Sequence, residues 1–223
     1  MSFLENIMTE KEEKEEIEKD EVREEEGETK VSYIFELVKV VIWSLIIIIP
    51  IRAFLFQPFF VKGVSMEPNF HDGEYLIVNE LGFKQTSISI GSKNLFTVKN
   101  FREFERGAVT VFHYPNDPKE FFIKRIIGLP GEKVVIKSNR VMIYNDEFPD
   151  GFILDESQYL SGNSQLTGCE GRCVYELSDD EYFVLGDNRN HSSDSRSWGK
   201  LNQKFVVGKV LLRAWPINDF DIF

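Results

Sequence analysis

Residues 59–70 read Phe-Phe-Val-Lys-Gly-Val-Ser-Met-Glu-Pro-Asn-Phe, and the rest of the chain is organised around this stretch. Ser65 lies at its middle, two residues after Gly63 and three before Pro68. A glycine lets the backbone approach a ligand closely, and a proline stiffens the chain that leaves. Taken alone, the stretch favours a serine in an ordinary turn. Only other parts of the chain make a catalytic serine the better interpretation.

Composition and charge narrow the class of protein. The 223 residues suit one domain with appendages, and a hydrophobic content of 42% is enough for a core. The net charge of −11 is unevenly distributed. Residues 1–57 hold 7 Lys/Arg against 14 Asp/Glu, and residues 58–223 hold 19 against 23. An acidic balance without a basic patch argues against nucleic acid as the partner.

The first part of the chain combines a charged tail with an apolar run. Residues 9–30 are almost all Glu, Lys and Asp and cannot bury a core, so we predict a disordered cytoplasmic tail over 1–33. The 20 residues from 37 to 56 carry only two charges, both near the ends, which suits a membrane-spanning helix. We therefore predict a transmembrane anchor helix over 34–57.

The charges around the apolar run set its expected orientation. The segment before the run is acidic and no pair of small residues follows it, which argues against a cleaved signal peptide. Four Lys/Arg lie between residues 19 and 39, against two between 52 and 71. The positive-inside rule then places the N-terminus in the cytoplasm. We predict a single-pass protein of the cell membrane, anchored in lipid, with the larger part of the chain on the extracytoplasmic side.

The remainder of the chain is rich in short apolar runs separated by glycine-rich turns. Such runs predict strands, and no segment shows the period of a long amphipathic helix. A turn at Ser138-Asn139 would join two of the strands as a hairpin. The sequence therefore predicts a mainly β fold. The expected strands cover residues 75–78, 109–112, 121–123, 134–136, 141–144, 183–185 and 206–212.

Cys169 and Cys173 are the only cysteines and lie in a polar, glycine-containing stretch. Outside the cytoplasm they are candidates for a disulfide, with free thiols as the alternative. A loop this short would gain only about 2 kcal/mol, so the bridge would staple a loop and not hold the fold. No second ligand pair lies nearby to complete a zinc site. We predict neither a metal nor a cofactor.

Lys124 follows the apolar run Phe-Phe-Ile and precedes Arg125. Burial and a neighbouring cation both disfavour the ammonium form, so both lower the pKa of a lysine. A neutral lysine can remove the proton of a serine hydroxyl in place of the usual histidine. The alternative is a pair of surface charges at the end of a strand, which is the commoner fate of such a pair.

Residues 186–199 read Gly-Asp-Asn-Arg-Asn-His-Ser-Ser-Asp-Ser-Arg-Ser-Trp-Gly. Acidic, basic and hydroxyl side chains alternate through the stretch, which Trp-Gly closes. So polar a segment is too specific for an ordinary loop. The pattern is typical of a buried network that orients a catalytic group.

Together with the anchor, these stretches resemble type I signal peptidase, a membrane-bound Ser/Lys endopeptidase that removes signal peptides from exported proteins. The resemblance runs from about residue 51 to residue 216, and its motifs occur in the same order. The motifs are residues 57–59, 65–68, 106–112, 124–131 and 186–199.

The resemblance implies both an architecture and a substrate. The expected catalytic domain is a coiled antiparallel β-sheet over 58–131 and 182–223, with a smaller β extension inserted over 132–181. The expected substrates are signal peptides of exported preproteins, cut after small residues. A functional link to the secretion translocon follows from that role.

The same resemblance implies roles for single residues. Ser65 would be the nucleophile and Lys124 the general base. Ser192 would form a hydrogen bond with the Lys124 amine and orient it. Asp194 and Arg196 would form a supporting ion pair.

Other positions of the implied site are less regular. Arg125 is expected beside the ion pair, where its charge would help to lower the pKa of Lys124, while Asp194 would act against this. The backbone N–H of Ser65 would contribute to the oxyanion hole. Some relatives have a serine hydroxyl as the second donor where this chain has Gly63, so that donor stays open.

Two departures and a set of pocket residues complete the implied site. His191 stands where an Asn is usual, and Lys62 where a Pro is frequent. Five apolar side chains match positions that line the substrate pockets in the family, although apolar residues at strand spacing are equally often core. They are Phe59, Val61, Met66, Phe70 and Ile123.

Alternative functions need features that this sequence lacks. A Ser-His-Asp hydrolase would have to use His71, His113 or His191, and none lies in a nucleophile-elbow context. A self-cleaving repressor would need an N-terminal DNA-binding unit. A non-catalytic membrane-tethered binding module would need Ser65 or Lys124 missing, and both are present. A specialised or organellar inner-membrane peptidase of the same family remains the nearest alternative.

Overall fold

The computed structural model describes residues 33–48, 56–84, 86–90, 93–98, 101–160 and 171–223. The chain divides into two compact units, residues 1–51 and residues 52–223, which are described separately.

The first unit contributes a helix over residues 33–48. Its apolar side chains are exposed, for example Trp43 and Ile47. Within the described residues, no helix combines the length and the apolar character needed to cross a membrane. The anchor helix was predicted to reach residue 57, but Phe56 and Gln57 belong to the first strand, where both pair with the second strand.

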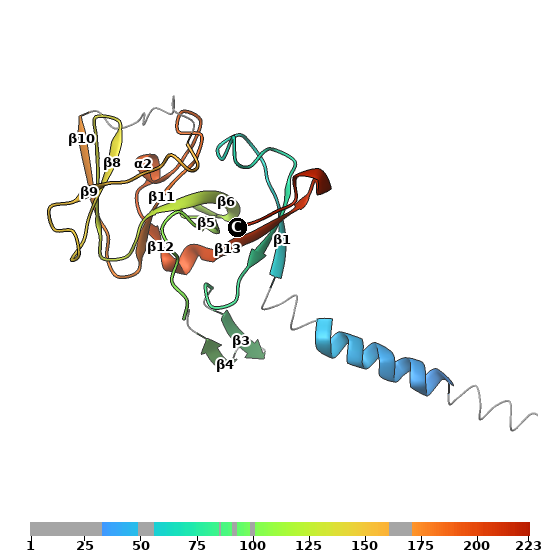
Figure 1. The fold of residues 1–223 in the computed structure, drawn as a ribbon. Helices are drawn as coiled ribbons and strands as arrows, with labels where there is room; N and C mark the ends of the chain where they lie inside the picture. Colours follow the sequence, from blue (N-terminus) through green and yellow to red (C-terminus); the bar gives the residue numbers. More distant parts are fainter. Residues whose placement is uncertain (1–32, 49–55, 85, 91–92, 99–100, 161–170) are drawn as a thin grey trace, which may run out of the picture. The chain divides into compact units, whose positions relative to one another are not determined.

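The second unit is mainly antiparallel β-sheet, as the short apolar runs predicted (Figure 1). Among the described residues, eight strands form the main sheet in the order β1-β2-β13-β5-β6-β11-β12, with β14 paired to β13. These strands are β1 (Phe56–Phe60), β2 (Tyr75–Asn79), β5 (Val109–Tyr114), β6 (Asp117–Gly128), β11 (Glu181–Leu185), β12 (Leu201–Asn202), β13 (Val206–Trp215) and β14 (Asp221–Ile222).

Strand β6 is longer than the sequence predicted and pairs with two strands, β5 and β11. It pairs with β5 from Asp117 to Arg125 and with β11 only from Arg125 to Gly128. The apolar run before Lys124 predicted a strand that ends at this residue, but Lys124 lies inside β6, which continues to Gly128. Irregular register in the β5–β13 and β2–β13 pairings adds local twist of the kind that bulges introduce.

A second sheet occupies the segment predicted as the inserted extension. Its order is β10-β7-β8-β9, and the predicted hairpin joins β7 to β8. Ser138 and Asn139 both have positive φ angles, as a tight hairpin turn requires. The strands are β7 (Lys133–Lys137), β8 (Arg140–Tyr144), β9 (Phe152–Ile153) and β10 (Arg172–Glu176).

An apolar cluster joins the second sheet to the end of the main sheet. Val134 and Ile143 of the second sheet pack with Ile127 of β6 and with Phe183 and Leu185 of β11. All five are buried, so the two sheets share one core at this point. The predicted limits of catalytic domain and extension stay a prediction, because residues 52–223 form one compact unit.

Several elements escaped prediction because they lack a continuous apolar run. Strand β10 alternates half-buried and exposed residues, so only Cys173 and Tyr175 signal it. The helix α2 (Ser195–Trp198) is a single turn capped by the Asp194 side chain. The other missed elements are β1, β9, β12, β14, the pair β3 (Thr86–Ile90) and β4 (Lys93–Val98), and the 3-10 turns η1 (Gln203–Phe205) and η2 (Ile217–Asp219).

Close packing of β13 against β2 gives a test of this fold. A side chain at Gly208 would collide with the carbonyl oxygen of Asn79, which is backbone and has little room to move. We expect Gly208→Ala to lower the free energy of unfolding by about 1–3 kcal/mol. Denaturant unfolding of the variant measures this loss.

Lys209→Ala, at the neighbouring half-buried position, is the control and should change that free energy by less than about 0.5 kcal/mol. Equal stabilities of the two variants would contradict the close approach of β2 to β13.

Candidate active site

Ser65 and Lys124 come together although 59 positions separate them in the chain. Ser65 lies in the turn that follows β1, and Lys124 lies on β6. The Nζ of Lys124 is 2.7 Å from the Oγ of Ser65 and donates a second hydrogen bond to the carbonyl oxygen of Ile123 at 2.7 Å. A neutral amine keeps one lone pair, so the same contact lets the Ser65 hydroxyl donate to nitrogen.

The environment of Lys124 favours the neutral amine. The residue is only 3% exposed, and its amine lies 5.4 Å from the ring centroid of Phe122. Burial lowers the pKa of Lys124 from 10.5 to about 8, because the charged form loses its hydration. The charges of Asp194 and Asp187 raise this pKa and oppose burial, while Arg196 lowers it.

The backbone of Ser65 is held in place by the segment 186–188. The N–H of Asn188 donates to the carbonyl oxygen of Ser65 at 3.0 Å. A side chain at Gly186 would collide with that same oxygen, so glycine is required where the two segments meet. No described group accepts a hydrogen bond from the N–H of Ser65. This N–H is therefore available to a ligand.

The conformation and the hydrogen bond of Gly63 belong to the turn that contains Ser65. Its φ angle is +84°, a conformation that other residues rarely adopt, and its N–H donates to Oδ1 of Asp72 at 2.6 Å. Because Asp72 already accepts from it, this N–H does not provide the second oxyanion donor that the sequence left open.

Asp194 and Arg196 form the ion pair that the motif predicted. Two nitrogens of the Arg196 guanidinium donate to the two carboxylate oxygens at 2.8 and 2.7 Å. The N–H of Gly186 donates to the same carboxylate at 3.0 Å. Burial alone would raise the pKa of Asp194, but these hydrogen bonds and the charge of Arg196 hold it below its ordinary value.

Arg125 acts differently from the sequence-based expectation. It donates to both oxygens of Asp187, at 2.8 and 2.6 Å, and to the carbonyl oxygen of Gly107 at 2.7 Å. It is not among the charges that shift the pKa of Lys124. The expectation failed because successive side chains of a strand point to opposite faces, so Arg125 points away from its neighbour.

Ser192 does not form the predicted hydrogen bond with Lys124. Its Oγ is buried beside the Asp194 carboxylate, close enough to help lower the pKa of that group. The contact falls short of a well-formed hydrogen bond, and no other described group pairs with this oxygen. Ser192 instead packs against Gly186 and leaves Ser65 as the side-chain partner of the amine.

A cleft of about 550 Å³ opens beside Ser65 and Lys124. The rings of Phe59 on β1 and Phe121 on β6 line it and contact each other edge to face, with centroids 5.2 Å apart. Most of the lining is apolar, with charge at Lys62 and Glu120. The lining residues are Phe59, Phe60, Val61, Lys62, Ser65, Leu76, Val111, Glu120, Phe121, Phe122, Ile123, Lys124 and Ser193.

The five predicted pocket residues divide into two groups. Phe59, Val61 and Ile123 line the cleft. Met66 and Phe70 do not: they are 1% and 0% exposed and belong to the core under β2 and β13. Their spacing along the turn sends these two side chains inward, so packing explains them and substrate contact does not.

The remaining predicted residues lie apart from the catalytic pair. His71 and His191 are exposed and His113 is half-buried, and none of the three contacts Ser65. Cys169 lies outside the described residues, while no described cysteine is free. The disulfide between Cys169 and Cys173 therefore stays a prediction.

Asp187 is a buried residue of the site for which the sequence predicted no role. It is 1% exposed, and its charge raises the pKa of Lys124, although by less than that of Asp194. Its pairing with Arg125 joins two segments that lie far apart in the chain, so no local pattern in the sequence could reveal it.

Several known proteins resemble this chain over much of its length. A family model described as signal peptidase, peptidase S26, matches residues 34–215. Signal peptidase I of Bacillus licheniformis is 32% identical over 198 residues, which is 88% of this chain and 96% of that protein. Signal peptidase IB of Staphylococcus aureus (strain Mu50 / ATCC 700699) is 29% identical over 184 residues, covering 79% and 87%. A crystal structure of a signal peptidase I from Enterococcus faecalis V583 is 28% identical, with a TM-score of 0.39, over 49% of this chain and 97% of its own.

The charges around Lys124 predict opposite effects of two substitutions. Arg125→Gln leaves the charge of Asp187 unpaired, so we expect the pKa of Lys124 to rise above about 8. Asp187→Asn removes a charge that raises this pKa, so the pKa should fall. An NMR titration of the Lys124 amine measures both shifts.

Lys62→Gln, an exposed charge at the cleft, is the control and should leave the titration in place. An unmoved pKa in both test variants would mean that the Asp187 charge does not reach the amine.

Proposed function

The chain belongs to the signal peptidase family, peptidase S26, and we propose that it cleaves with Ser65 as the nucleophile and Lys124 as the general base. Family membership makes it a serine endopeptidase that removes signal peptides from exported preproteins. The observation that supports the assignment of residues is the 2.7 Å contact between Lys124 Nζ and Ser65 Oγ.

The first proposed step transfers a proton within this contact. The neutral amine of Lys124 takes the proton of the Ser65 hydroxyl while the oxygen attacks the scissile carbonyl carbon. The ammonium then gives a proton to the leaving amine, and an acyl-enzyme with Ser65 remains. Water, deprotonated by the same amine, hydrolyses the acyl-enzyme and restores the serine.

The free N–H of Ser65 is the proposed donor to the oxyanion. The charge that develops on the carbonyl oxygen needs donors held in place before the reaction. The bond from Asn188 N–H to the Ser65 carbonyl supports this role, because it fixes the plane of the backbone at the nucleophile.

The cleft between β1 and β6 is the proposed site of the substrate backbone. Among the described strands, β1 pairs only with β2, and β6 meets β11 only beyond Lys124. Both strands therefore keep backbone groups free beside the cleft, to which an extended peptide can pair. Phe59, Val61 and Ile123 are proposed to accept the small and apolar side chains before the cut.

The proposed location is the cell membrane, with the catalytic unit on the extracytoplasmic side. The proposed anchor is the apolar run that begins in the helix over residues 33–48 and ends before β1. It is supported by the exposed apolar side chains of that helix and by the uncharged sequence from 40 to 51. Membrane lipid and the secretion translocon are the partners that follow from this placement. A specialised or organellar peptidase of the same family would share the mechanism and differ in its preproteins.

Removing either member of the pair should stop the reaction. We expect Ser65→Ala and Lys124→Ala each to lower kcat on a signal-bearing preprotein on the order of 10⁴-fold or more, because nucleophile and base act as a unit. Sequencing the new N-terminus of the product identifies the cut. Circular dichroism checks that both variants keep the β fold.

His191→Ala is the control and should keep most of the activity, since His191 is exposed and bonds to Asn188. An inactive His191 variant together with an active Lys124 variant would show that the general base is His191 and not Lys124.

The orientation of the chain is tested by protease added outside intact spheroplasts. We expect digestion of the region after residue 60 and protection of the acidic tail. Immunoblotting with antibodies to each part reads the result. Protection of both parts would mean that the anchor does not span the membrane, and digestion of the tail alone would mean that it is inverted.

A further inference from the structure

A short segment after β9 of the second sheet contacts residues that surround the catalytic pair. Residues 155–160, here called the strap, follow β9 and form a turn in which Tyr159 and Leu160 N–H groups both donate to the Glu156 carbonyl oxygen. Nothing in the strap lines the cleft. Its Glu156 and Tyr159 nevertheless contact three residues of the site.

The upper contacts of the strap reach Arg125 and Asn69. The Arg125 guanidinium lies 4.3 Å from the centroid of the Tyr159 ring, a cation–π distance. The side-chain amide of Asn69 donates to the Tyr159 carbonyl oxygen at 2.7 Å and to Asp187 at 2.9 Å. Asn69 belongs to the same turn as Ser65, so the strap is bonded directly to the nucleophile turn.

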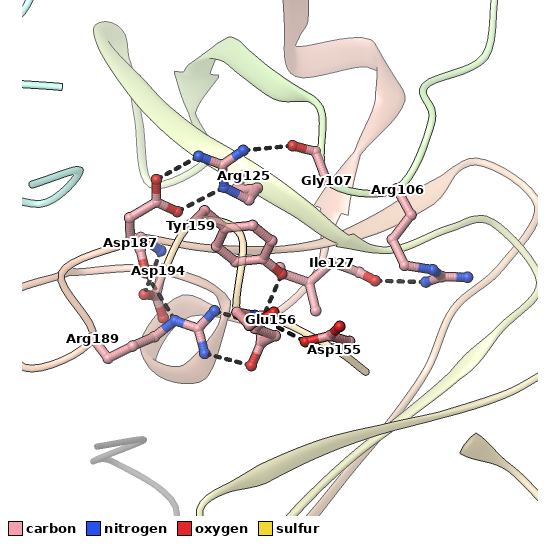
Figure 2. A network of polar contacts seen from close by, with 12 residues as sticks. Arg106, Gly107, Arg125, Ile127, Asp155, Glu156, Tyr159, Asp187, Arg189 and Asp194 are labelled. Carbon is pink, nitrogen blue, oxygen red and sulfur yellow. Dashed lines mark hydrogen bonds and ion pairs between the residues drawn. The ribbon is translucent and has the colours of Figure 1, made fainter. Parts of the chain in front are cut away.

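The lower contacts reach Arg189, as Figure 2 shows. Its guanidinium donates to both oxygens of Glu156, at 3.1 and 2.5 Å, and the Tyr159 hydroxyl donates to Glu156 at 3.1 Å. Arg189 is 2% exposed. Among the described residues, Glu156 is the only carboxylate that pairs with it. A buried arginine without this partner would be strongly unfavourable.

Arg189 is connected to Ser65 through the segment 186–188. Its Nε donates to the carbonyl oxygen of Gly186 at 3.0 Å, and its N–H donates to the carbonyl oxygen of Asp187 at 3.0 Å. Asn188, which lies between Asp187 and Arg189, donates its N–H to the Ser65 carbonyl oxygen. The strap therefore braces the segment 186–189 on one side and the nucleophile turn on the other.

We propose that the strap is a positioning element of the active site: Glu156 and Tyr159 hold Arg189 and Asn69, and through them keep Ser65 aligned with Lys124. The inserted sheet thus has a part in catalysis without touching the substrate. This inference rests on the proposed function, because it assumes that Ser65 and Lys124 perform the reaction.

The test uses Glu156→Gln in the full chain, purified in detergent, with a preprotein that carries an Ala-x-Ala cleavage site. We expect kcat to fall about tenfold or more, because small displacements of reacting groups slow catalysis strongly. KM should stay within about twofold, since the strap lies outside the cleft. The rising limb of the kcat/KM pH profile should not move, because Glu156 is not among the charges that shift the pKa of Lys124.

Asp155→Asn is the matched control and should keep kcat within about twofold of the parent, because this exposed side chain bonds to neither Arg189 nor Asn69 and the Asn oxygen can still accept from the Ser157 N–H. A Glu156 variant with unchanged kcat and a lowered Tm would overturn the proposal and leave the strap a purely structural element. A rise in KM alone, or a displaced pH limb, would also overturn it, in favour of substrate binding or of a direct charge effect.

Asn69→Ala tests the other end of the strap and does not disturb the buried arginine, which keeps the proposal open to test if the Glu156 variant fails to fold. The same loss in kcat at constant KM and pH limb is expected, and an unchanged kcat would overturn the proposal. Ser65→Ala is assayed in parallel: if it retains activity, the proposed function itself is wrong. If it is inactive while Glu156→Gln and Asn69→Ala match the parent, only the role of the strap is wrong.

Discussion

The site depends on one contact, the 2.7 Å separation of the Lys124 amine from the Ser65 hydroxyl. Lys124 is almost completely buried where it makes this contact. Burial makes the ammonium form unfavourable, so a larger fraction of the lysine is neutral near neutral pH and is available as the proposed base. A carboxylate near the buried amine would favour the ammonium form and raise the pKa of Lys124 again. The two carboxylates whose charges have this effect are Asp194 and Asp187.

Each buried carboxylate near Lys124 has its own arginine. Asp194 is paired with Arg196, and Asp187 with Arg125. Removing one member of such a buried pair leaves an uncompensated charge, which destabilises a protein more than the intact pair stabilises it. In each intact pair, the positive charge of the arginine partly cancels the negative charge of the carboxylate, so the carboxylate attracts the amine less strongly. The Arg125–Asp187 pair also joins β6 to the 186–199 segment, and so aligns the two sides of the site.

The fold supplies the distances that this network needs. Strand β6 holds Lys124 on one face and Arg125 on the other, because side chains alternate along a strand. Gly186 lets the 186–188 segment approach the Ser65 carbonyl. The second sheet is joined to β6 and β11 through a shared apolar core, which brings the 155–160 segment behind the site. Packing far from the cleft is thus connected to the geometry of the nucleophile.

The sequence by itself determined the class of the fold and the family, and it indicated Ser65 and Lys124 as the candidate pair. Short apolar runs are local signals of strands, and the motifs are contiguous residues whose chemistry can be read without a structure. Only the tertiary structure decided that Arg125 pairs with Asp187, that Met66 and Phe70 are core, that Ser192 leaves Lys124 to Ser65, and that Glu156 lies against Arg189. Each of these depends on which face a side chain takes, or on contacts between segments far apart in the chain. Those contacts are set by the packing of whole sheets and not by neighbours in sequence.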